Sequence, residues 1–390
     1  MLPYSIALLR LWGVWVPQEW WPTWRKKLYP AYTVFVICFV YANTLSQIIE
    51  LFTTYETVKG FINKSFILLS TIAGSVKGAH CILHRQEFIN LAKTLESYPC
   101  RPETLEEEAI QREFNKKIKH MNRRYITMHL FTITTLTIAS ILRDVPKGEL
   151  YYKAWIPFDY TSPPRFWSAY IHQVIAHYFD LCMHAGYDTL APGMMIHACA
   201  QFAILGHRFR ILPQRIKEQL RESADINECH EFKALETKKL TACVRHHLQI
   251  FEFAKTNNNI FSGMIFMQYT VSSLVLCMST LRLSQIHAFS PTLLSIFLYF
   301  LSMIVQIFMP CFAGNQITIA SERLCNDIYS MDWTILSTST KRSLAMIIAR
   351  AQKPLKFTSG YILTLSIDSF NSVVKTSYSA FNVLHGSSDF

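Results

Sequence analysis

The sequence predicts an all-α membrane protein with seven transmembrane helices, an intracellular N-terminus, an extracellular C-terminus and a cytoplasmic helical segment. The first observation is composition: 51% of the 390 residues are hydrophobic and only 17% are charged, whereas soluble domains carry about 25% charged residues. The second is the recurrence of apolar stretches long enough to cross a bilayer. They fall at 31–50, 65–83, 126–142, 187–206, 260–281, 292–313 and 358–384.

The third observation is the distribution of basic residues. Most of the 38 Lys and Arg residues fall in the N-terminal arm and in the connections at 84–125, 207–259 and 314–357. Basic connections stay on the cytoplasmic side of a membrane, so the N-terminus is predicted inside and, after seven crossings, the C-terminus outside. These connections also account for the net charge of +11, so no nucleic-acid partner is expected.

Four regions follow from this topology. Residues 1–30 form a cytoplasmic or interfacial arm, and its cluster of tryptophans predicts that it lies at the membrane surface. Residues 31–313 hold the first six transmembrane helices, residues 314–357 a cytoplasmic segment, and residues 358–390 the last helix and the extracellular end. Within the second region, the connection at 143–166 is rich in Pro and aromatic residues, which predicts an ordered lid on the outer side.

The last predicted helix carries a polar stripe. Steps of three and four residues place its members on one helix face; they are Asp368, Asn371, Lys375, Tyr378, Asn382 and His385. A membrane helix normally turns such a stripe toward protein or water, because a charge facing lipid costs several kcal/mol. Two interpretations stay open: the stripe is satisfied by neighbouring helices, or it lines an aqueous path.

The outer extension of the fourth span carries a second polar face, formed by His177, Asp180, His184 and Asp188. Imidazole and carboxylate groups on one face could hold a divalent metal, or they could hydrogen-bond to one another as polar packing or a vestibule. We favour the second interpretation and expect no metal site. Catalytic motifs such as G-x-S-x-G, the Walker loop and H-E-x-x-H do not occur, so neither enzymatic activity nor a cofactor is expected.

The end of the chain resembles the insect odorant receptors. The resemblance rests on Ser321, Glu322, Leu324, Tyr329, Trp333, Lys341, Arg342, Ser343, Leu344, Ile347, Ile348, Arg350, Gln352, Pro354, Gly360, Phe370, Lys375, Tyr378 and Ser379. The related gustatory receptors end differently, and G-protein-coupled receptors have the opposite orientation. The fourth connection is much shorter than that of the family's co-receptor, so the chain resembles a ligand-tuning subunit.

The resemblance implies an odorant-gated, non-selective cation channel in the plasma membrane of insect sensory neurons. Such a subunit forms a heterotetramer with the odorant receptor co-receptor (Orco) and binds a small volatile odorant. The last helix would line the central pore, with Phe381 and His385 at the gate. The cytoplasmic segment would be the anchor between subunits, with contacts from Tyr329, Trp333, Gln352 and Pro354.

The resemblance also implies a ligand pocket in the outer half of the bundle, where a mostly apolar lining suits volatile molecules. The expected lining residues are Phe66, Leu69, Ala73, Leu136, Ser140, Tyr178, Cys182, Phe297, Phe300 and Met303. Two other functions stay open. A metabotropic seven-helix receptor would signal through G proteins, and a membrane transporter would use Asp368 and Lys375 to bind substrate or protons.

Overall fold

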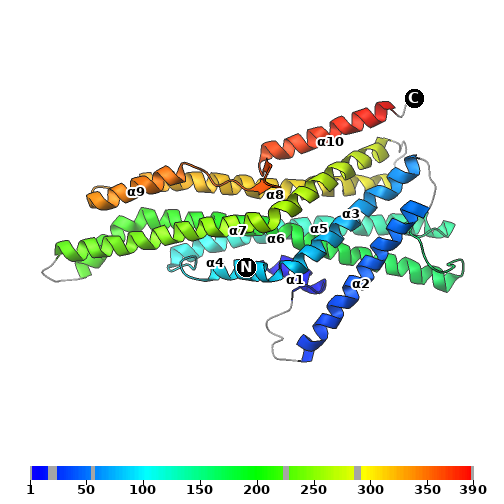
Figure 1. Cartoon of the computed structure of the whole chain (residues 1–390), viewed down its shortest axis with the longest axis horizontal. Helices are drawn as coiled ribbons and strands as arrows, with labels where there is room; N and C mark the ends of the chain where they lie inside the picture. Colours follow the sequence, from blue (N-terminus) through cyan, green and yellow to red (C-terminus); the bar gives the residue numbers. More distant parts are fainter. Residues whose placement is uncertain (1, 16–23, 54–57, 223–227, 285–290, 388–390) are drawn as a thin grey trace.

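Long helices build almost the whole protein (Figure 1). The computed structural model describes residues 2–15, 24–53, 58–222, 228–284 and 291–387. The helices are α1 (Pro3–Leu11), α2 (Trp24–Thr53), α3 (Val58–Leu83), α4 (Arg85–Glu96), α5 (Leu105–Arg143), α6 (Pro163–Glu222), α7 (Glu228–Ser284), α8 (Pro291–Tyr329), α9 (Thr338–Ala351) and α10 (Ile367–Ser387). A short 3-10 turn, η2 (Val145–Lys147), and two two-residue strands, β1 (Thr358–Ser359) and β2 (Leu363–Thr364), complete the described elements.

Within the described ranges, six helices are long and apolar enough to cross a membrane. Their segments are Lys27–Thr53, Ser65–Leu83, Leu105–Lys147, Pro163–Gln219, Phe232–Ser284 and Pro291–Tyr329. They contain the first six predicted spans, so the predicted all-α membrane fold is confirmed. Several helices are far longer than a bilayer is thick: α6 has 60 residues, which corresponds to about 90 Å.

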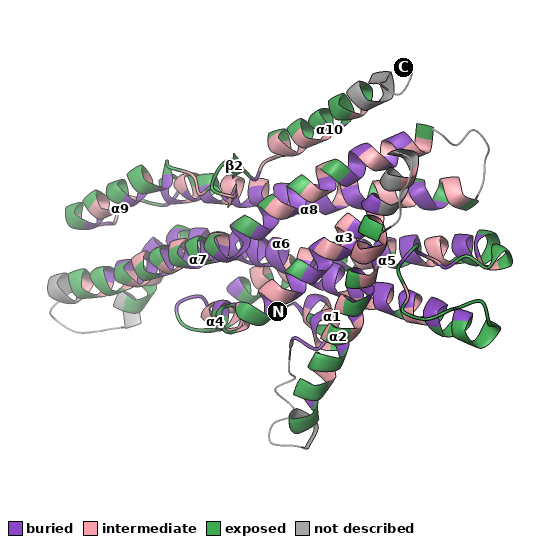
Figure 2. Ribbon diagram, turned by 45° about the vertical axis from the view of Figure 1, so that its right-hand side comes forward, coloured by how far each residue is buried: buried purple, intermediate pink, exposed green. Residues whose placement is uncertain are grey.

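Helix α6 forms the centre of the bundle. In its most apolar stretch, 94% of the residues are buried. Helices α1, α2, α3, α5, α7 and α8 all pack against α6. Figure 2 shows this burial along α6, whereas α2 and α10 remain largely exposed at the edges. The residues of α6 are therefore surrounded by several helices at once, which suits them to build an internal site.

A buried ion pair joins the far extensions of α5 and α6. Thr104 caps α5 by accepting the backbone N–H of Glu107 at 3.3 Å, as short polar residues do at helix starts. The Glu107 carboxylate in turn accepts from the Arg208 guanidinium at 2.8 and 3.1 Å. Because both side chains are buried, this pair fixes the rotation of α5 relative to α6.

The N-terminal arm differs from its predicted surface position. Helix α1 inserts into the bundle, where Leu2, Leu9 and Trp12 are fully buried, and the Ser5 hydroxyl hydrogen-bonds to Thr189 of α6 at 2.8 Å. The prediction weighed the tryptophans as interfacial anchors, but the apolar side chains of α1 fill a gap in the bundle core. Two further predicted anchors, Trp20 and Trp21, lie outside the described residues.

The last helix also begins later than predicted. Residues 358–364 form an antiparallel hairpin that turns at Gly360, whose φ is +58°, and α10 starts at Ile367. The hairpin is held on α7, where the Asn258 side chain accepts the Thr358 N–H at 2.8 Å. Backbone groups that the prediction assigned to a helix are thus hydrogen-bonded to a hairpin and to α7. The chain between α9 and α10 is therefore not helical around Gly360.

Candidate functional site

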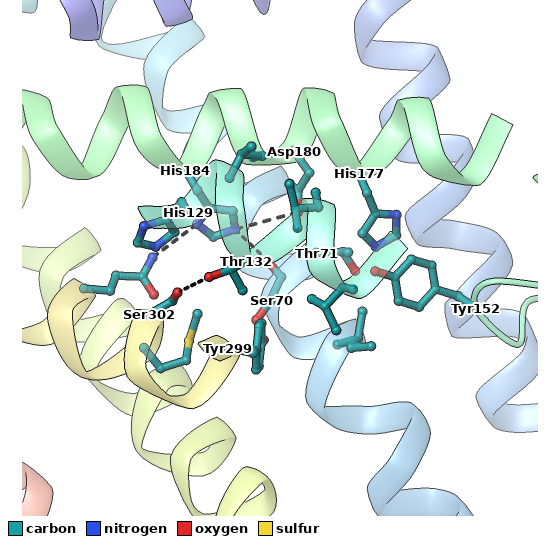
Figure 3. A pocket seen from close by; sticks show the side chains of 16 residues that line it. Ser70, Thr71, His129, Thr132, Tyr152, His177, Asp180, His184, Tyr299 and Ser302 are labelled. Carbon is teal, nitrogen blue, oxygen red and sulfur yellow. Dashed lines mark hydrogen bonds and ion pairs between the residues drawn. The ribbon is translucent and has the colours of Figure 1, made fainter. Parts of the chain in front are cut away.

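A buried cavity lies between α3, α5, α6 and α8 in the half of the bundle that carries the 144–162 connection (Figure 3). Its volume is about 90 Å³. The lining side chains are Ile67, Ser70, Thr71, His129, Thr132, Ile133, Leu136, Tyr152, His177, Asp180, Leu181, His184, Tyr299, Ser302, Met303 and Gln306. Most of the exposed wall is apolar, with hydroxyl, imidazole and carboxyl groups at separate points, as in sites for small organic ligands.

Hydrogen bonds between helices set the shape of the cavity. Thr132 of α5 bonds to Ser302 of α8 at 2.9 Å, and Ser70 of α3 bonds to Tyr299 of α8. Helix α3 approaches α6 closely at Gly74, where an added Cβ would lie 1.8 Å from an Asp180 carboxylate oxygen. Glycine is therefore required at this crossing, because a side chain there would push Asp180 out of place.

The aromatic connection is ordered and covers one end of the cavity, as a lid would. The Tyr152 ring stacks on His177, with centroids 3.8 Å apart, and the Gln173 amide bonds to both the backbone N–H and carbonyl of Tyr152 at 3.0 Å. Burial raises the pKa of Tyr152 well above its ordinary value, so its hydroxyl stays neutral. Ile67 and Tyr152 also line a second, outer cavity of about 270 Å³, so they form the wall between the two spaces.

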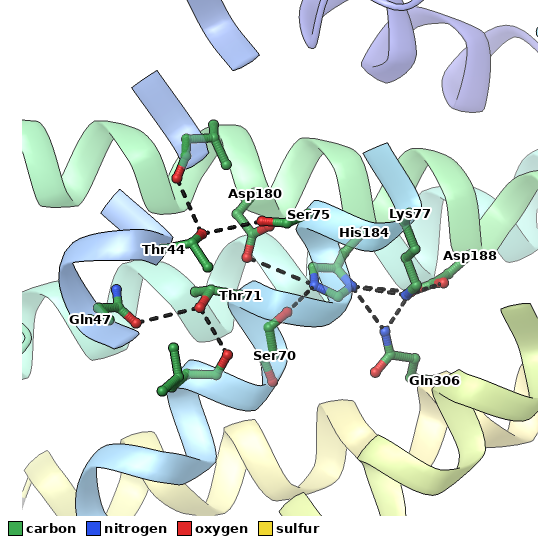
Figure 4. Close-up of polar contacts among 12 residues, drawn as sticks. Thr44, Gln47, Ser70, Thr71, Ser75, Lys77, Asp180, His184, Asp188 and Gln306 are labelled. Atoms are coloured by element: carbon green, nitrogen blue, oxygen red, sulfur yellow. Dashed lines mark hydrogen bonds and ion pairs between the residues drawn. The ribbon is translucent and has the colours of Figure 1, made fainter. Parts of the chain in front are cut away.

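A buried charge network forms the opposite end of the cavity (Figure 4). The Lys77 ammonium lies 2.6 Å from Asp188 and 2.9 Å from His184 Nδ1. Tyr125 and Gln306 donate further hydrogen bonds to Asp188. His184 Nε2 lies 3.0 Å from the Ser70 carbonyl, so His184 donates from Nε2 and accepts at Nδ1. Lys77 supplies the positive charge that the carboxylate of Asp188 needs, so the polar face of α6 is held by hydrogen bonds and an ion pair with neighbouring helices. No metal-binding cluster occurs among the described side chains.

Four polar atoms around the cavity are buried and have no hydrogen-bond partner among the described residues: His129 Nε2, His177 Nε2, Asp180 Oδ1 and Gln306 Oε1. All four residues line the cavity. Unpaired buried polar atoms are rare because each costs about 1–3 kcal/mol. Their concentration here indicates a site that a water molecule or a ligand with a polar group would complete.

Comparison with known proteins decides the family. The sequence model described as "7tm Odorant receptor" matches residues 57–378. The chain belongs to the odorant receptor family. It is 22% identical to Odorant receptor Or1 of Anopheles gambiae (97% of this chain, 94% of that protein). It is 23% identical to Odorant receptor 2a of Drosophila melanogaster (86% and 84%).

Solved structures show the same fold. The structure of the insect olfactory receptor OR5 from Machilis hrabei in complex with eugenol superposes with a TM-score of 0.82 at 18% identity, covering 99% of this chain and 97% of that one. A second structure of the same receptor gives a TM-score of 0.83 at 18% identity, covering 98% and 96%. These similarities establish the architecture of this odorant receptor along nearly its whole length.

Of the ten predicted pocket residues, Leu136 and Met303 line the cavity of this odorant receptor. Phe297 is 52% exposed on the outside of the bundle. Ser140 and Tyr178 hydrogen-bond to other helix residues instead. The remaining predicted residues do not line this cavity; they are Phe66, Leu69, Ala73, Cys182 and Phe300.

The prediction found only part of the face of α8 that points inward. Tyr299, Ser302, Met303 and Gln306 line the cavity at helical spacing, and of these only Met303 was predicted, together with Phe297 and Phe300, which do not line it. The polar spacing on α6 was the available signal: His177, Asp180 and His184 were recognised as one face, and this face lines the cavity.

The polar stripe of α10 is not buried within the chain. Asp368, Asn371, Lys375, Tyr378 and Asn382 are all exposed; His385 lies outside the side chains described. The opposite face packs on α7 and α8, with Ser377 buried and Phe370 at 5.4 Å from the Phe308 ring. Phe381 is half-buried, and no ion pair joins Asp368 to Lys375 in the part of the chain described. The interpretation in which neighbouring helices of the same chain satisfy the polar groups of the stripe is therefore wrong.

The predicted anchor residues divide into two groups. The Trp333 indole N–H bonds to the carbonyls of Ile328 and Tyr329 at 3.2 Å, so it closes the end of α8. Tyr329 is 79% exposed, Gln352 follows α9 as an exposed cap, and Pro354 is half-buried in the segment that follows. Tyr329 and Gln352 are thus accessible to another subunit.

Proposed function

We propose that this odorant receptor is the ligand-tuning subunit of an odorant-gated, non-selective cation channel, and that its odorant occupies the cavity between α3, α5, α6 and α8. The observation that carries the proposal is the set of four unpaired polar atoms around an otherwise apolar, buried cavity. Membership of the odorant receptor family supports it further, as does the eugenol complex of the Machilis hrabei receptor, which has the same fold.

The cavity chemistry favours a ligand class. Apolar walls from Ile133, Leu136 and Met303 suit an aliphatic or aromatic body, and the imidazoles of His129 and His177 suit one hydroxyl or carbonyl group. An anionic ligand is disfavoured, because a buried charge needs a partner and the nearby cation Lys77 already holds Asp188. The proposed odorant is therefore a small, neutral, weakly polar molecule.

The size of the cavity links binding to a conformational change. Its volume of about 90 Å³ is below the ~150 Å³ of an engineered cavity that accepts benzene. An odorant of that size must therefore displace side chains or helices. A ligand that fits only the expanded form shifts the population toward that form.

A physical route leads from the cavity to the last helix. Gln306 of α8 lines the cavity and donates to Asp188, and Phe308, about half a turn further on α8, packs on Phe370 of α10. Displacement of α8 by an odorant would thus reach α10 through direct contacts.

The exposed stripe on α10 supports the pore assignment. An ionisable face that its own chain leaves uncovered must find water or another subunit, since lipid is unfavourable for it. We place it around a water-filled axis shared with the co-receptor in a heterotetramer, in the plasma membrane of an insect sensory neuron. Tyr329 and Gln352 then contact the neighbouring subunit in the anchor region.

Electrical recording tests this function directly. Cells that express this chain with the co-receptor should show a cation current when small neutral odorants are applied, and the current should persist when G-protein signalling is blocked. A matched pair of variants localises the response: Leu136→Trp fills the cavity, whereas Phe297→Trp adds bulk outside it. An equal loss of the odorant-evoked current in both variants would contradict the assigned site. Saturable uptake of a substrate without any current would contradict the channel function.

A further inference from the structure

A further, much larger space lies between α5, α6 and α8, nearer the basic connections than the odorant cavity. Its volume is about 1200 Å³, compared with about 90 Å³ for the odorant cavity. The apolar part includes Met128 of α5 with Val305, Phe308 and Phe312 of α8, all half-buried. This groove is therefore open enough to admit a ligand and apolar enough to hold a hydrocarbon chain.

The other part of the same groove is basic. Five lining side chains are basic, namely Lys116, Lys117, Arg124, Arg210 and Arg323, and two are acidic, Glu113 and Asp327. The acidic groups are already paired, Glu113 with Lys117 at 2.7 Å and Asp327 with Arg210 at 3.6 Å. Across the described ranges, Lys116, Arg124 and Arg323 have no ion-pair partner. Five basic and two acidic side chains give the lining of the groove a net charge of +3.

The order of these groups along α5 matches a membrane boundary. Lys116, His120, Arg124 and Met128 line the groove and follow one another at steps of four, so they share one face. Met128 belongs to the apolar span, Arg124 lies just before its start, and Lys116 lies eight residues, or about 12 Å, further out. The polar layer of a bilayer extends roughly 5–7 Å beyond its hydrocarbon core. With 126–142 taken as the hydrocarbon span, Arg124 lies at the depth of the lipid phosphates, and the long Lys116 side chain extends back toward the headgroup from outside this layer.

We propose that this groove binds one anionic phospholipid from the leaflet on the side of the basic connections. An acyl chain would run along Met128, Phe308 and Phe312, the phosphate would neutralise Arg124, and the headgroup would lie beside Lys116. A neutral lipid would leave the local positive charge uncompensated, and a free phosphate would leave the apolar part empty. The proposal goes beyond odorant gating and does not depend on it.

A lipid at this position would also contact the gating route. Phe308 lines the groove and packs on Phe370 of α10, so an acyl chain beside Phe308 would support one side of α8. Removal of the lipid should therefore alter the response of the channel as well as lipid retention.

The test compares two double variants with the same change in charge on one helix. Lys116→Gln with Arg124→Gln removes groove charges, whereas Lys119→Gln with Arg123→Gln removes exposed charges that do not line the groove. The purified full-length receptor assembly is placed in nanodiscs of phosphatidylcholine with phosphatidylserine, and retained lipid is measured by native mass spectrometry. We expect the groove variant to bind phosphatidylserine at least about tenfold more weakly and the control to change less than about twofold.

Further arms separate the alternatives. Met128→Trp should fill the apolar end and reduce lipid retention with all charges intact, which keeps the test valid if the charge variant folds poorly. Soluble glycerophosphoserine should fail to displace the lipid, because it lacks the acyl chains. Equal loss in the groove and control variants, displacement by the soluble headgroup, or loss of subunit assembly with unchanged lipid retention would each overturn the proposal.

Discussion

Replacement of Lys77 by methionine tests the buried charge network. Lys77 is almost fully buried and lies 2.6 Å from Asp188, so Lys77→Met leaves a buried carboxylate without its cation. Breaking such a pair costs about 3–5 kcal/mol. Asp188 would keep its hydrogen bonds from Tyr125 and Gln306, which places the expected loss at the lower end, about 3 kcal/mol.

The double variant separates the pair from simple loss of packing. Lys77→Met combined with Asp188→Asn removes both charges, and its cost should be smaller, about 1–2 kcal/mol, because the amide can still accept from Tyr125. Thermal unfolding of the purified receptor, read by intrinsic fluorescence, reports these differences. Lys93→Met is the matched control, since Lys93 is exposed on α4 and its loss should stay within about 0.5 kcal/mol. If the double variant loses as much free energy of unfolding as Lys77→Met and Asp188→Asn lose separately, added together, then the pair contributes nothing and the reasoning is refuted.

Four other perturbations probe the cavity, the pore and the subunit contact. Met303→Ala should enlarge the cavity and shift the response toward bulkier odorants by about tenfold in half-maximal concentration; an unchanged ranking of odorants would contradict this. Asp180→Leu should raise the half-maximal concentration of hydroxyl-bearing odorants by about tenfold and leave that of hydrocarbon analogues of the same shape unchanged. An equal rise for both would argue against a polar contact. Lys375→Glu should raise the permeability of divalent relative to monovalent cations, measured from reversal potentials, whereas no change would place Lys375 away from the pore. Tyr329→Ala should weaken binding to the co-receptor by about 1–2 kcal/mol, seen as less co-receptor co-purified with the variant. Normal assembly would exclude Tyr329 from the interface.

Periodicity predicted the features that depend on one helix at a time. The length of the apolar stretches predicted the first six membrane helices, and steps of three and four residues predicted the polar face of α10, which the structure leaves exposed. The same spacing identified the face of α6 that carries His177, Asp180 and His184. These features follow from local geometry, so one sequence contains enough information to predict them.

Features that depend on the packing of distant segments could not be predicted in the same way. Lys77 and Asp188 are 111 residues apart, and their pairing depends on how α3 crosses α6 at Gly74. The rotation of α8, which turns Tyr299 inward and Phe297 outward, depends on contacts with the helices around it. The hairpin before α10 was missed because its backbone partners lie on α7, 100 residues earlier.

The most direct test of the account is the structure of the receptor–co-receptor complex with and without an activating odorant. The account predicts that the odorant lies between α3, α5, α6 and α8, within hydrogen-bond distance of His129, His177, Asp180 or Gln306. It also predicts a cavity larger than 90 Å³ and a displaced α8. An odorant bound elsewhere, with this cavity unchanged while the pore opens, would contradict it.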